Sequence, residues 1–240
     1  MNAIKFFKFN YRNSLLGAGL LTLVLVSCSK SNDDYYDLPD AAAVGVVHAS
    51  AGLPALDVAL DNNRLGVSYF NYTDRIEYFR AYTGNREIKV YNAGAASANP
   101  LFSKGLSFDA GKYYTVFIVD TAAKMDAVSL GDSTRSAGQD SVRIRFANMS
   151  PDASGLDLYV KGEANPIATN ITYKKAGNFF SYKATFNIVF ELRPTGQNTL
   201  LATMEPINLM RGNIYTIWSG GYRAGSQATG TRIKLDAFAH

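Results

Sequence analysis

The sequence has 240 residues, with 24 lysines and arginines against 20 aspartates and glutamates, and hydrophobic residues make up 47% of it. This length and composition predict an ordered chain that can bury one or two hydrophobic cores. Its single cysteine and two histidines exclude a disulfide-stapled fold and argue against a multi-histidine or cysteine-based zinc site. We expect no metal and no cofactor.

The first 27 residues have the pattern of a bacterial signal peptide. A basic segment with Lys5, Lys8 and Arg12 precedes an apolar run over 15–26, which is too short to span a bilayer as a stable helix. The tetrapeptide at 25–28, Leu-Val-Ser-Cys, resembles a lipobox. The sequence therefore predicts cleavage after residue 27 and attachment of lipid, diacylglycerol and palmitate, to Cys28.

Removal of this segment changes the charge of the chain. All three basic residues of 1–27 leave with the leader and no acidic residue does, so 21 basic and 20 acidic side chains remain. No basic stripe survives in the remainder, which excludes nucleic-acid binding on electrostatic grounds.

Residues 28–40 are polar and acidic without apolar periodicity, and they predict a flexible tether. Ser29 beside Cys28 argues against retention at the inner membrane. The lysine and acidic pair that follow are typical of export to the outer membrane, facing outward, although a plain solvated linker is the alternative.

The rest of the chain contains an internal repeat. Residues 42–60 align with 142–160 without a gap, and 110–116 align with 211–217. Both copies are rich in β-branched and aromatic residues on pleated, half-buried surfaces, and turn signals separate the runs. We predict an all-β fold of two tandem antiparallel β-sandwiches, immunoglobulin-like or transthyretin-like, over 41–130 and 141–240, with a linker at 131–140.

The opening of each copy also carries a family resemblance. Residues 142–153 followed by 156–160, and 47–50 through 56–58, resemble the opening signature of domain of unknown function 4397; 110–116 resembles its second landmark. The first copy lacks the Pro-Asp that follows the serine in the second. The resemblance implies an exported, often duplicated and lipidated β-sandwich, and it supplies no activity and no catalytic residues.

His48, Ser50 and Asp57 suggest a base, a nucleophile and an orienting acid. The second copy keeps Ser150 and Asp157 but has asparagine at the position of the histidine. We therefore expect turn roles, in which each serine caps the bend after the first strand and each aspartate accepts backbone N–H groups where the next strand begins.

A second hydrolase pattern consists of Asp132 and Ser133 after a glycine, with Asp236 and His240 near the end of the sequence. We set it aside because the serine lies in the predicted linker and His240 is expected to fray.

Aromatic residues crowd the middle of both copies. Core packing explains most of them, but some remain candidates for an exposed platform that stacks on sugar rings or a partner. These possible ligand-facing residues are Tyr69, Tyr72, Tyr78 and Tyr182.

The anchor, the tether and the duplicated β module predict a cell-envelope lipoprotein that is not an enzyme. We expect it to act in binding, adhesion or envelope assembly, with the membrane as one partner and a surface glycan or protein as another. The alternatives are an accessory subunit or cryptic hydrolase acting on extracellular polysaccharide or protein, and a structural spacer.

Overall fold

The computed structural model describes residues 40–66, 69–95, 99–135 and 137–240. The predicted signal peptide, Cys28 and almost all of the tether lie outside the described residues. The described residues form one compact unit. Apart from a short 3-10 turn, η1 (Ala122–Lys124), every regular element within these ranges is a strand, which confirms the all-β prediction. No described helix is long and apolar enough to cross a membrane.

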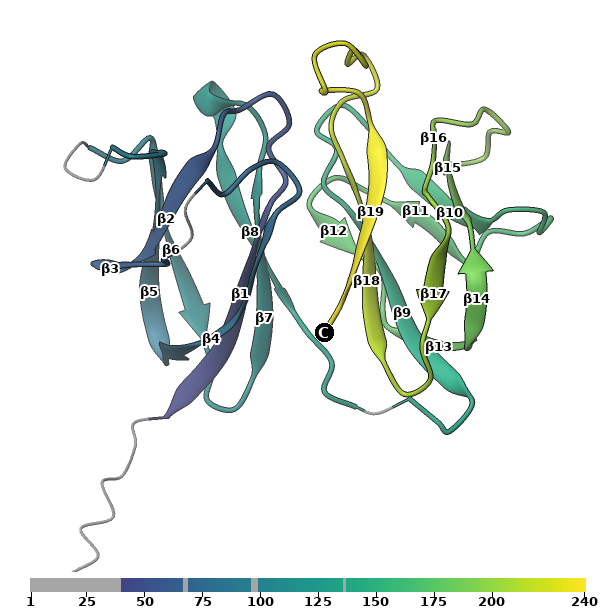
Figure 1. Ribbon diagram of the computed structural model, residues 1–240, viewed down its shortest axis with the longest axis horizontal. Coiled ribbons are helices and arrows are strands. Elements are labelled where there is room, and N and C mark those ends of the chain that lie inside the picture. Colours follow the sequence, from purple (N-terminus) through teal and green to yellow (C-terminus); the bar gives the residue numbers. More distant parts are fainter. Residues whose placement is uncertain (1–39, 67–68, 96–98, 136) are drawn as a thin grey trace, which may run out of the picture. The chain divides into compact units, whose positions relative to one another are not determined.

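The first strand set, β1 to β8, forms two sheets of four strands each (Figure 1). Sheet A has the order β4-β1-β7-β8, and its strands are β4 (Arg75–Tyr82), β1 (Ala41–His48), β7 (Tyr113–Val119) and β8 (Asp126–Gly131). Sheet B has the order β3-β2-β5-β6, and its strands are β3 (Asn63–Arg64), β2 (Leu56–Leu60), β5 (Gly84–Asn92) and β6 (Phe102–Phe108).

The second strand set, β9 to β19, follows the same order with additions. In sheet C, β9 (Ser141–Asn148) pairs on one side with β12 (Lys175–Ala176) and β13 (Phe180–Lys183), and on the other with β18 (Ile214–Gly220), which pairs with β19 (Lys234–Ala239). Sheet D joins β11 (Ala168–Ile171), β10 (Leu156–Val160), β15 (Phe190–Pro194) and β16 (Ala202–Thr203). A separate ribbon pairs β14 (Thr185–Ile188) with β17 (Ile207–Leu209).

The sheets are not purely antiparallel, and on this point the prediction was wrong. The central strands β1 and β7 run parallel, with Val46 opposite Val116, and β9 and β18 run parallel, with Phe146 opposite Ile217. Parallel neighbours require a long crossover connection. The chain between β1 and β7 supplies it by forming all of sheet B, and the chain between β9 and β18 does the same with sheet D.

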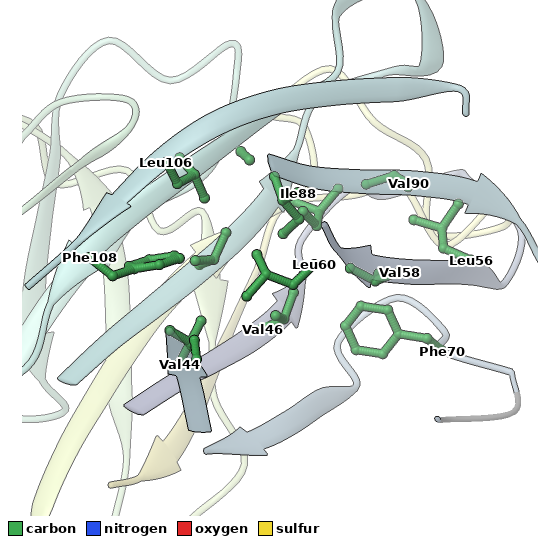
Figure 2. Close-up of a cluster of buried hydrophobic side chains, with 14 of the residues drawn as sticks. Val44, Val46, Leu56, Val58, Leu60, Phe70, Ile88, Val90, Leu106 and Phe108 are labelled. Atoms are coloured by element: carbon green, nitrogen blue, oxygen red, sulfur yellow. The ribbon is translucent and has the colours of Figure 1, made fainter. Parts of the chain in front are cut away.

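Each strand set has its own core. In the first, Val44 and Val46 from sheet A face Ile88 and Val90 from sheet B; Figure 2 shows these side chains with Phe70 and Phe108 closing the cluster. In the second, sheets C and D and the ribbon enclose a comparable cluster, whose largest fully buried members are Ile144, Phe146, Leu156 and Phe190.

A third cluster contains residues from both strand sets. It consists of Val47, Ala49, Phe117, Val119, Ala147, Met149 and Trp218. The ring centroids of Phe117 and Trp218 lie 5.7 Å apart. The central strands of sheets A and C are therefore buried on both faces, unlike the half-buried surfaces expected from the sequence, and this explains the uninterrupted apolar runs of β7 and β18.

The predicted linker at 131–140 begins inside regular structure. Gly131 is the last residue of β8 and pairs with Tyr114. The side chain of Asp132, the next residue, is fully buried. The polar composition of this stretch predicts a solvated connection, but its first residue ends a strand and the side chain of its second residue is buried.

Candidate functional site

The turn after β1 is held by the ring of His48, and the turn after β9 by the amide of Asn148. The backbone N–H of Ser50 donates to Nδ1 of His48 at 3.3 Å, and that of Ser150 donates to Oδ1 of Asn148 at 2.9 Å. Histidine and asparagine thus offer an acceptor at the same place, which explains why one replaces the other between the copies.

The other polar atom of each side chain, Nε2 of His48 and Nδ2 of Asn148, faces a nearby carbonyl oxygen. Nε2 of His48 lies 3.5 Å from the carbonyl oxygen of Pro54, and Nδ2 of Asn148 donates to the carbonyl oxygen of Ile171 at 3.0 Å. Burial lowers the pKa of His48 to about 4, so the ring is neutral near pH 7. Both ring nitrogens are engaged in the turn, and this leaves none for general-base work.

The serine hydroxyls do not cap these turns, contrary to the prediction. Ser50 and Ser150 are fully buried, and neither Oγ has a hydrogen-bond partner within the described part of the chain. The cap comes instead from the residue two positions earlier. Neither serine is placed as a nucleophile, because each is enclosed and the His48 ring accepts the backbone N–H of Ser50, not its hydroxyl.

Replacing Ser50 or Ser150 with alanine is expected to leave the free energy of unfolding unchanged or raise it slightly. A buried hydroxyl without a partner costs about 1–3 kcal/mol of desolvation, and alanine removes that group. Urea denaturation of the single variants measures the effect. A loss of more than about 1 kcal/mol would show that the hydroxyls do stabilise the turns.

The two aspartates do accept backbone N–H groups, but from segments far along the chain. Oδ2 of Asp57 accepts from the N–H of Gly94 at 3.0 Å and forms an ion pair with Arg64 at 2.7 Å. Asp157 accepts from the N–H of Asn170 at 2.7 Å and from that of Gly196 at 3.4 Å. Each carboxylate therefore fastens its strand to segments that lie beside it in the fold, and this is a structural role.

Asp132 forms a buried polar cluster that neither hydrolase pattern anticipates. Its Oδ1 forms an ion pair with Nη2 of Arg145, and its Oδ2 accepts from Thr115 Oγ1 at 2.7 Å and from the Tyr78 hydroxyl at 2.6 Å. Nη1 of Arg145 donates to the carbonyl of Gly131 at 2.7 Å. Burial lowers the pKa of the Arg145 guanidinium, and the charge of Asp132 opposes that shift.

His240 completes a closed network of hydrogen bonds, which we call the buried ring. Its members are Asp132, Arg145, Thr216, His240 and Tyr78. Nε of Arg145 donates to Thr216 Oγ1 at 2.9 Å, which lies 2.6 Å from His240 Nε2; His240 Nδ1 lies 2.6 Å from the Tyr78 hydroxyl. Every group is satisfied when the Thr216 hydroxyl donates to Nε2 and Nδ1–H donates to the Tyr78 oxygen. The ring therefore requires a neutral histidine.

The prediction that His240 frays was wrong. Its side chain is 5% exposed, and its backbone N–H donates to the carbonyl of Ile214 at 2.9 Å. Nδ1 of His240 lies 3.8 Å from Asp132 Oδ2, so the structure does bring together two residues of the hydrolase pattern. It leaves Ser133 and Asp236 outside the buried ring, and the enclosure of the ring bars a substrate from it.

The four candidate aromatic residues have different environments. Tyr69 is 73% exposed. Nζ of Lys234 lies 4.5 Å from the centroid of the Tyr72 ring, which is largely buried, and Tyr78 belongs to the buried ring. Neither of the last two offers a free platform. Tyr182 lines a groove.

This groove lies where the end of β10 meets β13 and β14, and its volume is about 320 Å³. The Tyr182 hydroxyl donates to Oε1 of Glu163 at 3.0 Å. Burial and this carboxylate raise the pKa of Tyr182 to about 12, so the phenol stays protonated and its ring stays oriented. The groove is lined by Val160, Lys161, Glu163, Tyr182, Lys183, Thr185, Asn187, Ile188 and Val189.

The fold and this groove define an all-β protein of packed sheets with an open, partly aromatic, polar depression. Residues 42–159 match the family model described as Domain of unknown function (DUF4397). This single match begins in β1 and ends in β10, so it includes the opening motif of the second copy. No curated protein matches the chain.

Three solved structures show weak likeness. One is a family 26 carbohydrate-binding module from Eubacterium rectale in complex with maltoheptaose (TM-score 0.25, 10% identity, covering 83% of this chain and 96% of that chain). Another shows alpha-glucan recognition by family 41 carbohydrate-binding modules from streptococcal virulence factors (0.24, 11%, 80% and 95%). A third is a fimbrial assembly protein from Parabacteroides distasonis (0.22, 9%, 82% and 98%). Likeness at this level carries no inference about a ligand.

Proposed function

We propose that this chain is a non-catalytic, envelope-tethered binding protein that holds an extracellular glycan in the groove beside Tyr182. The observation that carries the proposal is the oriented, partly exposed ring of Tyr182 in a depression that also contains neutral hydrogen-bonding side chains. Sugar rings bind to proteins through their apolar faces on aromatic rings and through hydroxyls bonded to polar groups. Thr185 and Asn187 supply such groups.

The proposal includes the anchor and the duplication. Lipid on Cys28 attaches the chain to the outer membrane, facing outward, and the two strand sets are tandem copies of one β-sandwich module. The matching strand order of sheets A and C, and of B and D, supports the duplication. Labelling of intact cells with palmitate checks the anchor: the wild-type protein is expected to take up label and Cys28→Ser is expected to lose it.

Tyr182→Ala in soluble residues 33–240 is expected to weaken glycan binding by at least about tenfold, since a central aromatic contact contributes more than about 1.4 kcal/mol. Titration calorimetry against a panel of polysaccharide fragments measures the loss. Tyr182→Phe keeps the ring but releases Glu163, and it separates stacking from orientation.

Tyr69→Ala is the matched control, because Tyr69 is an exposed tyrosine of the other strand set. It is expected to bind as the wild type does. If Tyr69→Ala loses binding while Tyr182→Ala keeps it, the site lies elsewhere. If the soluble protein binds no glycan of the panel, the proposed function is wrong and a protein partner becomes the working hypothesis.

A further inference from the structure

The groove beside Tyr182 is lined by two lysines and one carboxylate. Lys161 follows β10 directly, and Lys183 is the last residue of β13. Neither forms an ion pair with any residue that the structure describes, whereas the described lysines Lys89, Lys104 and Lys174 each pair with an acid. The groove thus holds two cations that no described acid pairs with, and its one carboxylate leaves an excess positive charge.

Glu163 does not neutralise either lysine. Its carboxylate accepts the hydroxyl of Tyr182 at 3.0 Å, and it forms no ion pair within the described residues. The acid therefore fixes the aromatic ring, and the net charge of the three ionised side chains is positive. A ligand that stacks on Tyr182 meets this positive field.

Backbone pairing fixes the positions from which both lysines extend. The N–H of Lys161 donates to the carbonyl of Val189 at 2.9 Å, which joins the end of β10 to the segment after β14. Lys183 pairs with Ser141 of β9, one position after Tyr182 pairs with Val142. The two flexible side chains thus start from different, fixed elements around one depression.

We propose that the glycan bound in this groove is anionic, and that its carboxylate or sulfate lies between the ammonium groups of Lys161 and Lys183 while its ring packs on Tyr182. This inference rests on the proposed glycan-binding function. Ammonium groups form charge-assisted hydrogen bonds with such oxygens, and the free ligand brings the counter-charge that the groove lacks. Neutral hydroxyls of the same ligand bond Thr185 and Asn187.

The test compares charged and neutral forms of the same saccharide on soluble residues 33–240. One arm uses oligogalacturonate and its neutral, carboxyl-reduced form, which tests the carboxylate. The other uses a carboxyl-reduced chondroitin sulfate oligosaccharide, whose only charges are sulfates, and the same oligosaccharide after removal of its sulfates, which tests the sulfate. We expect at least about tenfold tighter binding of an acidic form. Raising the ionic strength from about 0.02 M to about 0.5 M is expected to weaken that binding and to spare the neutral form.

The double variant Lys161→Gln/Lys183→Gln is expected to lose the preference and the salt dependence while still binding the neutral form. Lys112→Gln/Lys124→Gln, which removes two exposed lysines of the first strand set, carries the same change in net charge and is expected to behave as the wild type. Thermal unfolding of both variants verifies their fold.

Equal affinity for charged and neutral forms would overturn this inference and leave the groove as a site for neutral glycans. An acidic preference that persists in Lys161→Gln/Lys183→Gln would overturn it as well, because the anion then binds elsewhere. Absence of binding to all four saccharides, together with a blank across the wider panel, would overturn the proposed function itself.

Discussion

Replacing Asp132 with alanine is expected to lower the free energy of unfolding by about 3–5 kcal/mol, because it leaves a buried guanidinium without its counter-ion. The side chains of Asp132 and Arg145 are 0% and 3% exposed. The substitution also removes the acceptor of the Thr115 and Tyr78 hydroxyls. Guanidinium chloride denaturation measures the loss, since this denaturant unfolds stable β proteins within an accessible range.

Asp140→Ala is the matched control for this substitution. Asp140 forms an ion pair with Arg211 at 3.2 Å, but the two side chains are 83% and 73% exposed, and water screens the pair. We expect Asp140→Ala to change the free energy of unfolding by less than about 1 kcal/mol. If the two alanine variants lose the same amount, the buried pair contributes no more than a surface pair.

A double variant distinguishes loss of attraction from the cost of an unpaired charge. Asp132→Ala/Arg145→Met removes both charges and keeps an apolar side chain of similar length at the second site. It is expected to be more stable than Asp132→Ala alone, because no isolated ion remains buried. A double variant that is less stable than the single one would show that Arg145 stabilises the fold mainly through its bonds to Thr216 and Gly131.

The all-β character of the fold was predictable from the sequence, because strand propensity and turn signals are local patterns. The turn motif was also recognised, but its capping atom was assigned to the wrong residue. Serine and histidine two positions apart both suit a turn, and the sequence does not distinguish them. In the fold the N–H of Ser50 donates to His48, and the Ser50 hydroxyl has no partner among the described residues. The replacement of His48 by Asn148 pointed to the correct capping residue, because both side chains carry a hydrogen-bond acceptor at the δ1 position.

The buried ring was missed because it joins residues far apart in the sequence. Arg145 lies in an apolar strand, where the alternation of Arg143 and Arg145 with core residues suggests a solvent-facing side. The first copy has Gly45 at the equivalent position, and a Cβ there would lie 3.2 Å from the carbonyl oxygen of Ile76 and 3.6 Å from the ring of Tyr78. The missing side chain of Gly45 leaves space for Tyr78, and Arg145 supplies the charge that pairs with Asp132. Because these two residues lie on different strands, the pattern of a single strand does not show the cluster.

The groove beside Tyr182 was anticipated only as one tyrosine among four. Exposure separates the four: the hydroxyl of Tyr78 is bonded inside the buried ring, and Tyr72 packs near His48 with its ring centroid 6.2 Å away. Strand alternation gives the side of a sheet to which a residue points, but it does not show whether another sheet covers that side. Sheets A and C pack on each other through the third cluster, and this packing determines which side chains are covered.

Acidification is expected to destabilise the protein between about pH 6.5 and about pH 4 through its two histidines. Burial lowers the pKa of both His48 and His240 from 6.5 to about 4. In this window the unfolded chain binds more protons than the folded chain. The stabilisation is therefore complete above the unfolded pKa and decreases as the pH falls, by up to about 1.4 kcal/mol per pH unit for each histidine.

The charged groups around each imidazole are consistent with this lowering of the histidine pKa values. For His48, desolvation outweighs the carboxylate of Asp74, which favours the charged ring. For His240, desolvation and the guanidinium groups of Arg145 and Arg75 outweigh the carboxylate of Asp132. Protonation would also place a second N–H on each ring, against the backbone N–H of Ser50 in one case and the hydroxyl of Thr216 in the other.

His48→Asn isolates one histidine, because the second copy shows that asparagine holds the same turn. At about pH 7 we expect this variant to retain most of its stability, within about 1.5 kcal/mol of the wild type. Urea denaturation from about pH 7 down to about pH 4.5 is expected to give it a shallower decline in unfolding free energy, by up to about 1.4 kcal/mol per pH unit. Carboxylates titrate in both proteins, so their contribution cancels in the difference. Parallel curves would show that His48 has the same pKa in the folded and the unfolded chain, and the account in which the fold holds a neutral ring would then be wrong.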